Sequence, residues 1–202
     1  MIISAFSDTH GEPPPTIVGD VILHAGDVYE SDSYDVGVKK WAALDKRILA
    51  VRGNHDGFDP AGFFDGREFT VAEIEEGLWV VGLGFATQDL SFGPYAVPAE
   101  HKMTQIVAEV LKESAALIPQ GASVLLLSHY APASMWHDPK EGFFFSCIVK
   151  ACEALRPLVL LHGHIHQLAG RRYYVGETPV MGLGPRGFNF KVENGILTEL
   201  ES

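Results

Sequence analysis

The chain has 202 residues, of which 47% are hydrophobic and 20% are charged, a balance typical of a soluble globular protein. This length fits a single domain over residues 1–202 with enough chain to bury a core. The formal net charge of −11 argues against a general nucleic-acid binder, because such proteins neutralise phosphates with lysine and arginine. The longest apolar runs are strand-sized and the first residues lack the basic segment of a signal peptide, so the expected location is the cytoplasm.

Two short apolar runs near the start of the chain are each followed by a carboxylate. Residues 2–7 and residues 21–24 predict buried strands. Asp8 and His10 follow the first run, and Asp27 follows the second. Each motif alone is also an ordinary turn, since Asp favours turns. The repetition of a carboxylate directly after an apolar strand favours a shared site.

A third strand end carries an amide, an imidazole and a carboxylate. The pattern predicts a helix over residues 31–47 and a strand over residues 48–51, after which come Asn54, His55 and Asp56. Asn54 offers an amide oxygen as a ligand, and His55 is a candidate proton donor. Asp56 is placed to fix the tautomer of His55. A simple Asn-His-Asp-Gly turn is the alternative interpretation.

The middle of the chain predicts core elements separated by loops. A strand pair is expected over residues 69–75 and 78–83, and a helix over residues 100–118. The apolar stripe of this helix follows the i, i+3, i+4 spacing and is expected to be core. Residues 84–98 and 130–142 have no periodicity and are expected to be loops that flank the site.

The second half of the chain adds histidines at two more strand ends. The run 124–127 ends in Ser-His129, and the run 158–161 leads into His-Gly-His-Ile-His, which contains His164 and His166. A neutral imidazole is the commonest protein ligand for a transition metal. A lone histidine after a strand is more often structural, so the argument depends on the whole set of residues.

The remaining segments are expected to serve the core. A helix over residues 145–155 carries Cys147 and Cys152 on its apolar side, and no disulfide framework is implied. Strands are expected over residues 171–175, 179–183, 188–192 and 196–200, with an Asn-Gly hairpin turn before the last.

Five strand ends therefore carry potential metal ligands. The donors mix nitrogen and oxygen, which suits Mn, Fe or Zn better than Ca or Mg. Their number exceeds one coordination sphere and fits two ions that share a carboxylate, an arrangement used for phosphoryl displacement. The candidate ligands are Asp8, His10, Asp27, Asn54, His129, His164 and His166.

In this order, the blocks Asp-x-His, Gly-Asp, Gly-Asn-His-Asp, Ser-His and Gly-His-x-His resemble the calcineurin-like metallophosphoesterase superfamily. The resemblance implies an α/β fold: a β-sandwich flanked by helices, with a dimetal site at the strand carboxyl ends. It further implies that His55 protonates the leaving oxygen or stabilises charge in the transition state, with Asp56 behind it. By the family pattern, one metal would be held by Asp8, His10, Asp27 and His166, and a second by Asp27, Asn54, His129 and His164.

The resemblance also narrows the expected activity. Gly26-Asp27 is not followed by the Val-Asp-Arg-Gly run of protein serine/threonine phosphatases. The Leu-His-Ala-Gly-Asp and Gly-His-Ile-His blocks are similar to the subgroup with class III cyclic-nucleotide phosphodiesterases and brain-type metallophosphoesterases. The implied enzyme is a metal-dependent phosphoesterase that cleaves a phosphodiester, in preference to a monoester, by attack of metal-bound hydroxide on phosphorus.

The expected cofactors are two divalent transition-metal ions, with manganese first and iron or zinc as alternatives. The expected partner is a small phosphorylated substrate, for which a nucleotide is one candidate, without a stable nucleic-acid complex or a membrane. Tyr95 and Trp136 could stack on a base, or simply pack within their own loops. Two other functions stay open: a catalytically weak scaffold on the same fold, and a structural protein with a single metal.

Overall fold

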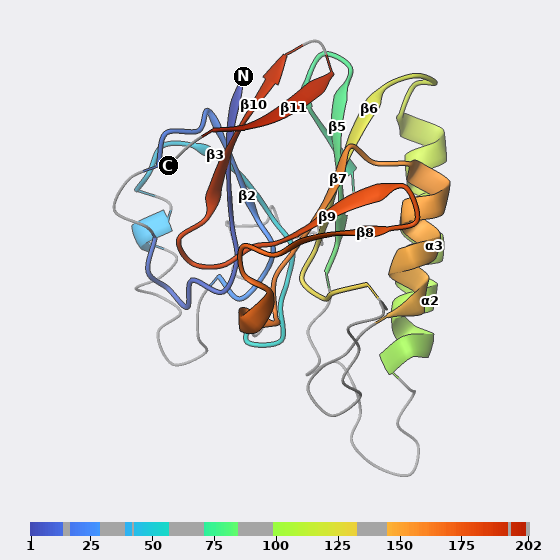
Figure 1. The fold of residues 1–202 in the computed structure, drawn as a ribbon, viewed down its shortest axis with the longest axis horizontal. Helices are drawn as coiled ribbons and strands as arrows, with labels where there is room; N and C mark the ends of the chain where they lie inside the picture. Colours follow the sequence, from blue (N-terminus) through green and yellow to red (C-terminus); the bar gives the residue numbers. More distant parts are fainter. Residues whose placement is uncertain are drawn as a thin grey trace.

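The structure is a computed structural model that describes residues 1–13, 17–28, 39–41, 43–56, 71–84, 99–132, 145–193 and 195–200. Its strands form two sheets that face each other, and two helices lie on the outer side of one sheet (Figure 1). The α/β sandwich with flanking helices that the sequence predicts is thereby confirmed. Within the described ranges, no helix is both long and apolar enough to span a membrane.

The first sheet has the strand order β11-β10-β1-β2-β3 among the described residues. Its members are β1 (Ile2–Phe6), β2 (Val21–His24), β3 (Arg47–Ala50), β10 (Phe188–Glu193) and β11 (Ile196–Leu200). Strands β1, β2 and β3 run parallel, so their carboxyl ends lie at the same edge of the sheet. Strand β10 pairs antiparallel with β1 and with β11, which brings the end of the chain beside its start.

The second sheet has the order β4-β5-β6-β7-β9-β8. Its members are β4 (Val71–Glu75), β5 (Leu78–Leu83), β6 (Ser123–Ser128), β7 (Val159–His162), β8 (Arg172–Val175) and β9 (Thr178–Gly182). The four central strands are parallel, and β4 and β8 are antiparallel edges. Strands β6 and β7 therefore end side by side.

The core sits in two layers because successive strand residues point to opposite faces of a sheet. Leu125 and Leu127 of β6 face the first sheet and pack in one cluster with Ile3 and Ala5 of β1. Leu126, between them, faces the helices instead. A strand buried on both faces reads as a continuous apolar run, and this is why β6 and β7 were recognisable in the sequence.

Helices α2 (Ala99–Leu117) and α3 (Ser146–Leu155) cover the outer face of the second sheet (Figure 1). The stripe of α2 predicted as core is confirmed, since Met103, Val107 and Val110 are all buried against this face. Both cysteines of α3 are buried on the side of the helix that faces the core, as expected.

Several predicted bounds differ from the structure or lie outside it. A helix was predicted over residues 31–47, but strand β3 already begins at Arg47. Within that range residues 39–41 are helical, and residues 29–38 and 42 lie outside the described part. Of the two predicted loops, residues 85–98 and 133–142 are likewise outside it. A short 3-10 helix, η3 (His166–Leu168), begins at the last histidine of the cluster and was not predicted.

Candidate metal centre

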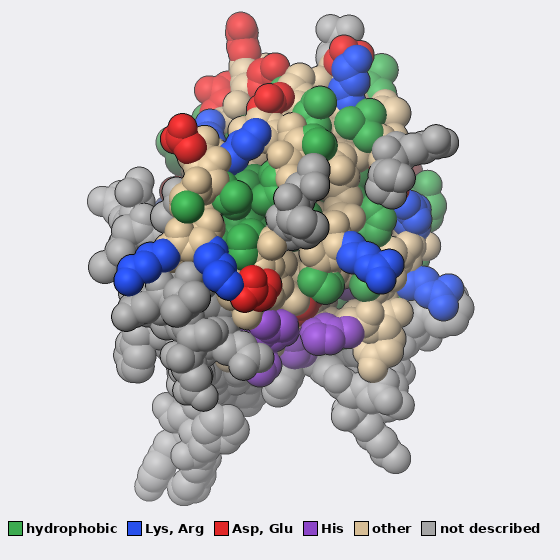
Figure 2. All heavy atoms as spheres, turned by 90° about the vertical axis from the view of Figure 1, so that its left-hand side faces the viewer, with side chains coloured by type: hydrophobic (Ala, Val, Ile, Leu, Met, Phe, Trp, Pro, Cys, Tyr) green, Lys and Arg blue, Asp and Glu red, His purple; other side chains and the backbone are tan. Residues whose placement is uncertain are grey.

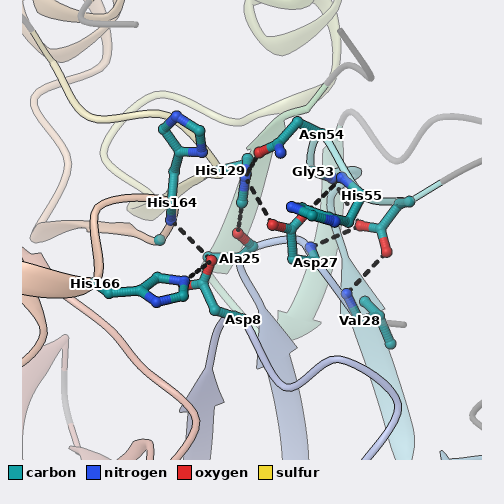
Figure 3. A network of polar contacts seen from close by, with 12 residues as sticks. Asp8, Ala25, Asp27, Val28, Gly53, Asn54, His55, His129, His164 and His166 are labelled. Carbon is teal, nitrogen blue, oxygen red and sulfur yellow. Dashed lines mark hydrogen bonds and ion pairs between the residues drawn. The ribbon is translucent and has the colours of Figure 1, made fainter. Parts of the chain in front are cut away.

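The ligand-type residues from five strand ends meet between the two sheets (Figure 3). Two groups of side chains each bring their ligand atoms within 4.8 Å of one another. One group consists of Asp8, His10 and His166, and the other of Asp8, Asp27 and His129. These side chains come from the ends of β1, β2, β6 and β7, because parallel strands deliver their carboxyl ends to one edge.

The ring of His129 is oriented so that one nitrogen lone pair faces other acceptors. Its Nδ1 lies 2.8 Å from the carbonyl oxygen of Ala25, a contact in which Nδ1 must be the donor. The lone pair then belongs to Nε2, which lies 2.9 Å from Oδ1 of Asn54 and 3.5 Å from Oδ2 of Asp27. Three acceptor atoms that face one another fit a bound cation, which would replace their mutual repulsion by attraction.

The group around Asp8 opens to solvent. Oδ1 of Asp8 accepts the backbone N–H of His164 at 3.1 Å and lies 3.6 Å from Nε2 of His166. The side chain of His166 is 65% exposed, whereas the Asp8 side chain is only 2% exposed. Figure 2 shows histidine side chains gathered in a patch on the lower part of this face. A ligand from solution can therefore approach on this side.

His164 is the predicted ligand whose ring lies apart from both groups. Its backbone contacts Asp8, but its ring is turned away from that carboxylate (Figure 3). The ring centroid lies 5.0 Å from His129 and 5.0 Å from Tyr130. A rotation of this side chain would be needed for its nitrogens to face the Asp27 carboxylate.

His55 and Asp56 follow β3 and have different surroundings. His55 is exposed, its backbone N–H donates to Oδ1 of Asp27 at 2.8 Å, and its ring lies 5.2 Å from that of His10. Asp56 is fully buried, and its carboxylate accepts backbone N–H groups of Gly53, Asp27 and Val28. These contacts tie Asp56 to the backbone of two loops, and its role behind His55 stays a prediction.

Burial sets the protonation of the site. It lowers the pKa of His129, and it lowers the pKa of His164 to about 4, so both imidazoles are neutral at pH 7, as metal ligands must be. Burial also raises the pKa of Asp27 to about 6, and the negative charge of Asp8 acts in the same direction. Two buried carboxylates this close favour a cation between them.

Glycines let the loops approach the candidate ligands. A Cβ on Gly53 would overlap the carboxylate and backbone nitrogen of Asp27, and one on Gly163 would lie 2.7 Å from Cβ of Ser7 and 2.9 Å from Oδ2 of Asp8. Only glycine fits such positions, so these residues bring the loops after β3 and β7 against the loops after β1 and β2. The chemistry and the spacing of the donors both fit a metal centre.

The sequence did not reveal the side chains that surround the donors. Tyr130 is buried with its ring against His129 and His164. Thr9 and His24 form a buried hydrogen bond of 2.9 Å beside the first motif. In the sequence, only their positions could have indicated a place at the site, since Tyr130 directly follows His129 and Thr9 lies between two candidate ligands.

Solved structures with the same fold come from several organisms. A protein from Thermus thermophilus, TT1561, matches with a TM-score of 0.68 and 14% identity, covering 98% of this chain and 97% of that one. A dimetal phosphatase from Danio rerio matches with a TM-score of 0.62 and 12% identity, covering 96% and 93%. Phosphopantetheinyl hydrolase from Mycobacterium tuberculosis matches with a TM-score of 0.53 and 15% identity, covering 91% and 90%.

No curated protein sequence matches the chain. The model of the family described as calcineurin-like phosphoesterase matches residues 2–168, which include every candidate ligand and most of the chain. The sandwich, the ligand-bearing strand ends and this match agree, and the chain belongs to the calcineurin-like phosphoesterase family.

Proposed function

We propose that the protein is a hydrolase that cleaves a small phosphodiester with the help of two divalent transition-metal ions, manganese first among them. The observation that carries the proposal is the convergence of Asp8, Asp27 and His129, buried side chains from three strand ends whose ligand atoms lie within 4.8 Å of one another. Membership of the calcineurin-like phosphoesterase family supports phosphoester hydrolysis as the reaction class.

The chain would hold the two ions with different parts of the site. In this proposal Asp8, His10 and His166 bind the ion on the solvent side, and Asp27 reaches both ions. Asn54 and His129 complete the inner position, together with His164 after a rotation of its ring. Bound divalent ions supply Lewis-acid chemistry and activate water for attack on phosphorus.

His55 is the proposed proton donor to the leaving oxygen. The backbone N–H of His55 donates to the Asp27 carboxylate at 2.8 Å, and this hydrogen bond fixes the position of the backbone that carries the ring. The ring is exposed and lies 5.2 Å from that of His10, so it borders the solvent-side position. An imidazole at this border can reach an oxygen that leaves phosphorus while the neighbouring donors hold the ions.

A phosphodiester is proposed over a monoester because the Leu-His-Ala-Gly-Asp and Gly-His-Ile-His blocks are similar to the phosphodiesterase subgroup. The net charge of −11 does not oppose an anionic substrate, since bound cations make the local field positive. A nucleotide is one candidate substrate. The name of the Danio rerio structure, a dimetal phosphatase, is consistent with the use of two ions.

The test is a parallel assay on metal-stripped protein. Bis-p-nitrophenyl phosphate and p-nitrophenyl phosphate are offered with and without Mn²⁺, and bound metal is counted on the same samples. The proposal expects two ions per chain and faster Mn²⁺-dependent turnover of the diester. Faster turnover of the monoester would reverse the substrate preference and leave the metal centre in place.

Two other outcomes favour the alternatives. Two bound ions without turnover of either substrate would favour a scaffold on the same fold. A single tightly held ion without turnover would favour a structural metal protein, because half of the candidate ligands would then have no task.

A further inference from the structure

Four of the seven candidate ligands sit on strained backbone. Asp8, His10, Asp27 and His164 have φ angles of 54°, 48°, 54° and 66°, a left-handed conformation that residues with a side chain rarely adopt. Such strained residues persist only where surrounding contacts hold them. Side chains that fix these loops are therefore part of what makes the site.

Asp56 contacts the backbone of two of these loops at once. Its Oδ2 accepts the N–H of Asp27 and the N–H of Gly53, both at 2.7 Å, and its Oδ1 accepts the N–H of Val28 at 2.8 Å. These lengths are typical of charge-assisted hydrogen bonds, which are about twice as strong as neutral ones. The side chain is fully buried, so water does not compete for the carboxylate.

These contacts determine where two candidate ligands lie. Asp27 has its own N–H held by Asp56 and its carboxylate aimed at His55 and His129. Asn54 directly follows Gly53, whose N–H also donates to Asp56. Oδ1 of Asn54 lies against Nε2 of His129, the ring that Asp27 also approaches. The Asp56 carboxylate thus links the loops after β2 and β3, beside the hydrogen bond from the His55 N–H to the Asp27 carboxylate.

The loop after β2 is also held from the opposite side. The carbonyl oxygen of Val28 accepts the N–H of Gly11 at 2.7 Å and the hydroxyl of Thr9 at 3.2 Å. Since the single hydroxyl proton of Thr9 goes to Val28, Nε2 of His24 is the donor in its 2.9 Å contact with Thr9. Val28 is therefore fixed through both its N–H and its carbonyl.

We infer that Asp56 is a positioning residue that holds the inner metal position together by binding backbone amides of the loops after β2 and β3. This inference rests on the metal-binding part of the proposed function. It gives Asp56 a different task from the expected contact with His55, because Asp56 acts on metal affinity through the backbone amides it binds.

The test is Asp56→Asn in the full chain. The amide group of Asn must lose at least one of the three backbone bonds and direct an N–H at a backbone N–H. Mn²⁺ binding to the metal-stripped protein, measured by equilibrium dialysis, is expected to weaken by about 10- to 100-fold, the range seen when partners of metal ligands are removed. The Mn²⁺-saturated variant should keep the pH–rate profile of the unmodified protein.

Asp20→Asn is the matched control. Asp20 also accepts a backbone N–H, from Ile2 at 2.8 Å, but it lies at the start of β2, at the other end of that strand from Asp27. Its Mn²⁺ affinity should equal that of the unmodified protein. Should Asp56→Asn fail to fold, Asp56→Glu replaces it, since it keeps the charge but its extra methylene displaces the carboxylate from the three amides; the same loss of affinity is expected.

Unchanged Mn²⁺ affinity in a folded Asp56 variant overturns the inference alone. A shifted pH–rate profile with unchanged affinity also overturns it, and would assign Asp56 to His55. Failure of the unmodified protein to bind Mn²⁺ defeats the proposed function and the inference with it, so the two failures are distinguishable.

Discussion

His55 is exposed at the border of the metal centre, yet its backbone is fixed by Asp27. A side chain in this place can act on substrate without holding the site together. Its neighbours His10 and Asp27, in contrast, carry donor atoms for the proposed ions. Single substitutions should therefore separate chemistry from metal binding.

Replacing His55 with Ala should lower turnover and leave the metal content intact. Loss of a general acid costs about 10²- to 10⁴-fold in rate, and none of the proposed ligand atoms belongs to the His55 side chain. Diester turnover and bound Mn²⁺ are measured on the same preparation. Unchanged turnover would remove His55 from its proposed role, and a parallel loss of metal would make it a ligand.

His24 should make the stability of the fold depend on acid. Burial lowers its pKa from 6.5 to about 3, with smaller contributions from His129 and His10. Between these two pKa values His24 is protonated in the unfolded chain and neutral in the folded chain. The free energy of unfolding therefore falls as the pH falls from 6.5 toward 3. One such group contributes a slope of about 1.4 kcal/mol per pH unit in this window.

The measurement compares His24→Gln with the unmodified protein, both metal-free, by urea unfolding from pH 4 to pH 7. The variant should be less stable at neutral pH, and its free energy of unfolding should fall less steeply with acid. His101→Gln, at an exposed histidine of α2, is the control and should leave the slope unchanged. Equal slopes for the His24 variant and the unmodified protein would contradict the prediction.

Helix α3 ends on a residue in an unfavourable conformation. Arg156 caps it in the left-handed region, with φ 46° and ψ 55°, while its N–H bonds the carbonyl of Cys152 at 2.9 Å. Glycine is the usual residue at such a position because it has no Cβ to clash. Pro157 then prevents the helix from continuing.

Replacing Arg156 with Gly should raise the free energy of unfolding by up to about 1 kcal/mol, the left-handed penalty less the extra backbone entropy that glycine loses. Lys150→Gly, at an exposed position inside α3, should instead lower it by about 1 kcal/mol. Both are read from urea unfolding. A loss of stability in the Arg156 variant would show that its side chain contributes more than the strain costs.

Sequence patterns predicted individual elements better than their pairing. The runs that became β6 and β7 were recognisable because both of their faces are buried. The pattern could not show that β10 would insert between β1 and β11, or that Ile3 would pair with Phe190, since register depends on packing between distant segments.

For the candidate site, too, the sequence predicted some features and could not predict others. The motifs predicted which side chains would meet, because parallel strands end at one edge of a sheet. They could not predict that the His164 ring would turn toward Tyr130, or that Asp56 would bind backbone amides. Those contacts depend on loop conformations that a spacing does not encode.

Charge is distributed unevenly over the whole molecule. Asp8, Asp27 and Asp56 are all buried at the carboxyl ends of the parallel strands. At the opposite end, Glu75, Glu76 and Glu193 line a shallow pocket near the start of the chain, and Figure 2 shows acidic side chains gathered there. The acidic residues of that pocket can stay solvated, whereas the buried carboxylates need partners. We therefore expect bound cations to stabilise the fold at the end that carries Asp8 and Asp27.

Removing metal should destabilise the entire fold. A ligand that binds only the folded state adds about 2.7 kcal/mol per site at 100 times its dissociation constant. Unfolding midpoints are compared with excess Mn²⁺, with EDTA and with Ca²⁺. Mn²⁺ should stabilise more than Ca²⁺, because imidazole nitrogens suit transition metals and Ca²⁺ prefers oxygen alone.

Asp27→Asn should lose most of the Mn²⁺ increment, since it removes the carboxylate that both ions share in the proposed site. Equal midpoints in Mn²⁺ and EDTA would contradict a metal centre built into the fold, whereas equal effects of Mn²⁺ and Ca²⁺ would mean that the carboxylates bind the ions without the histidines.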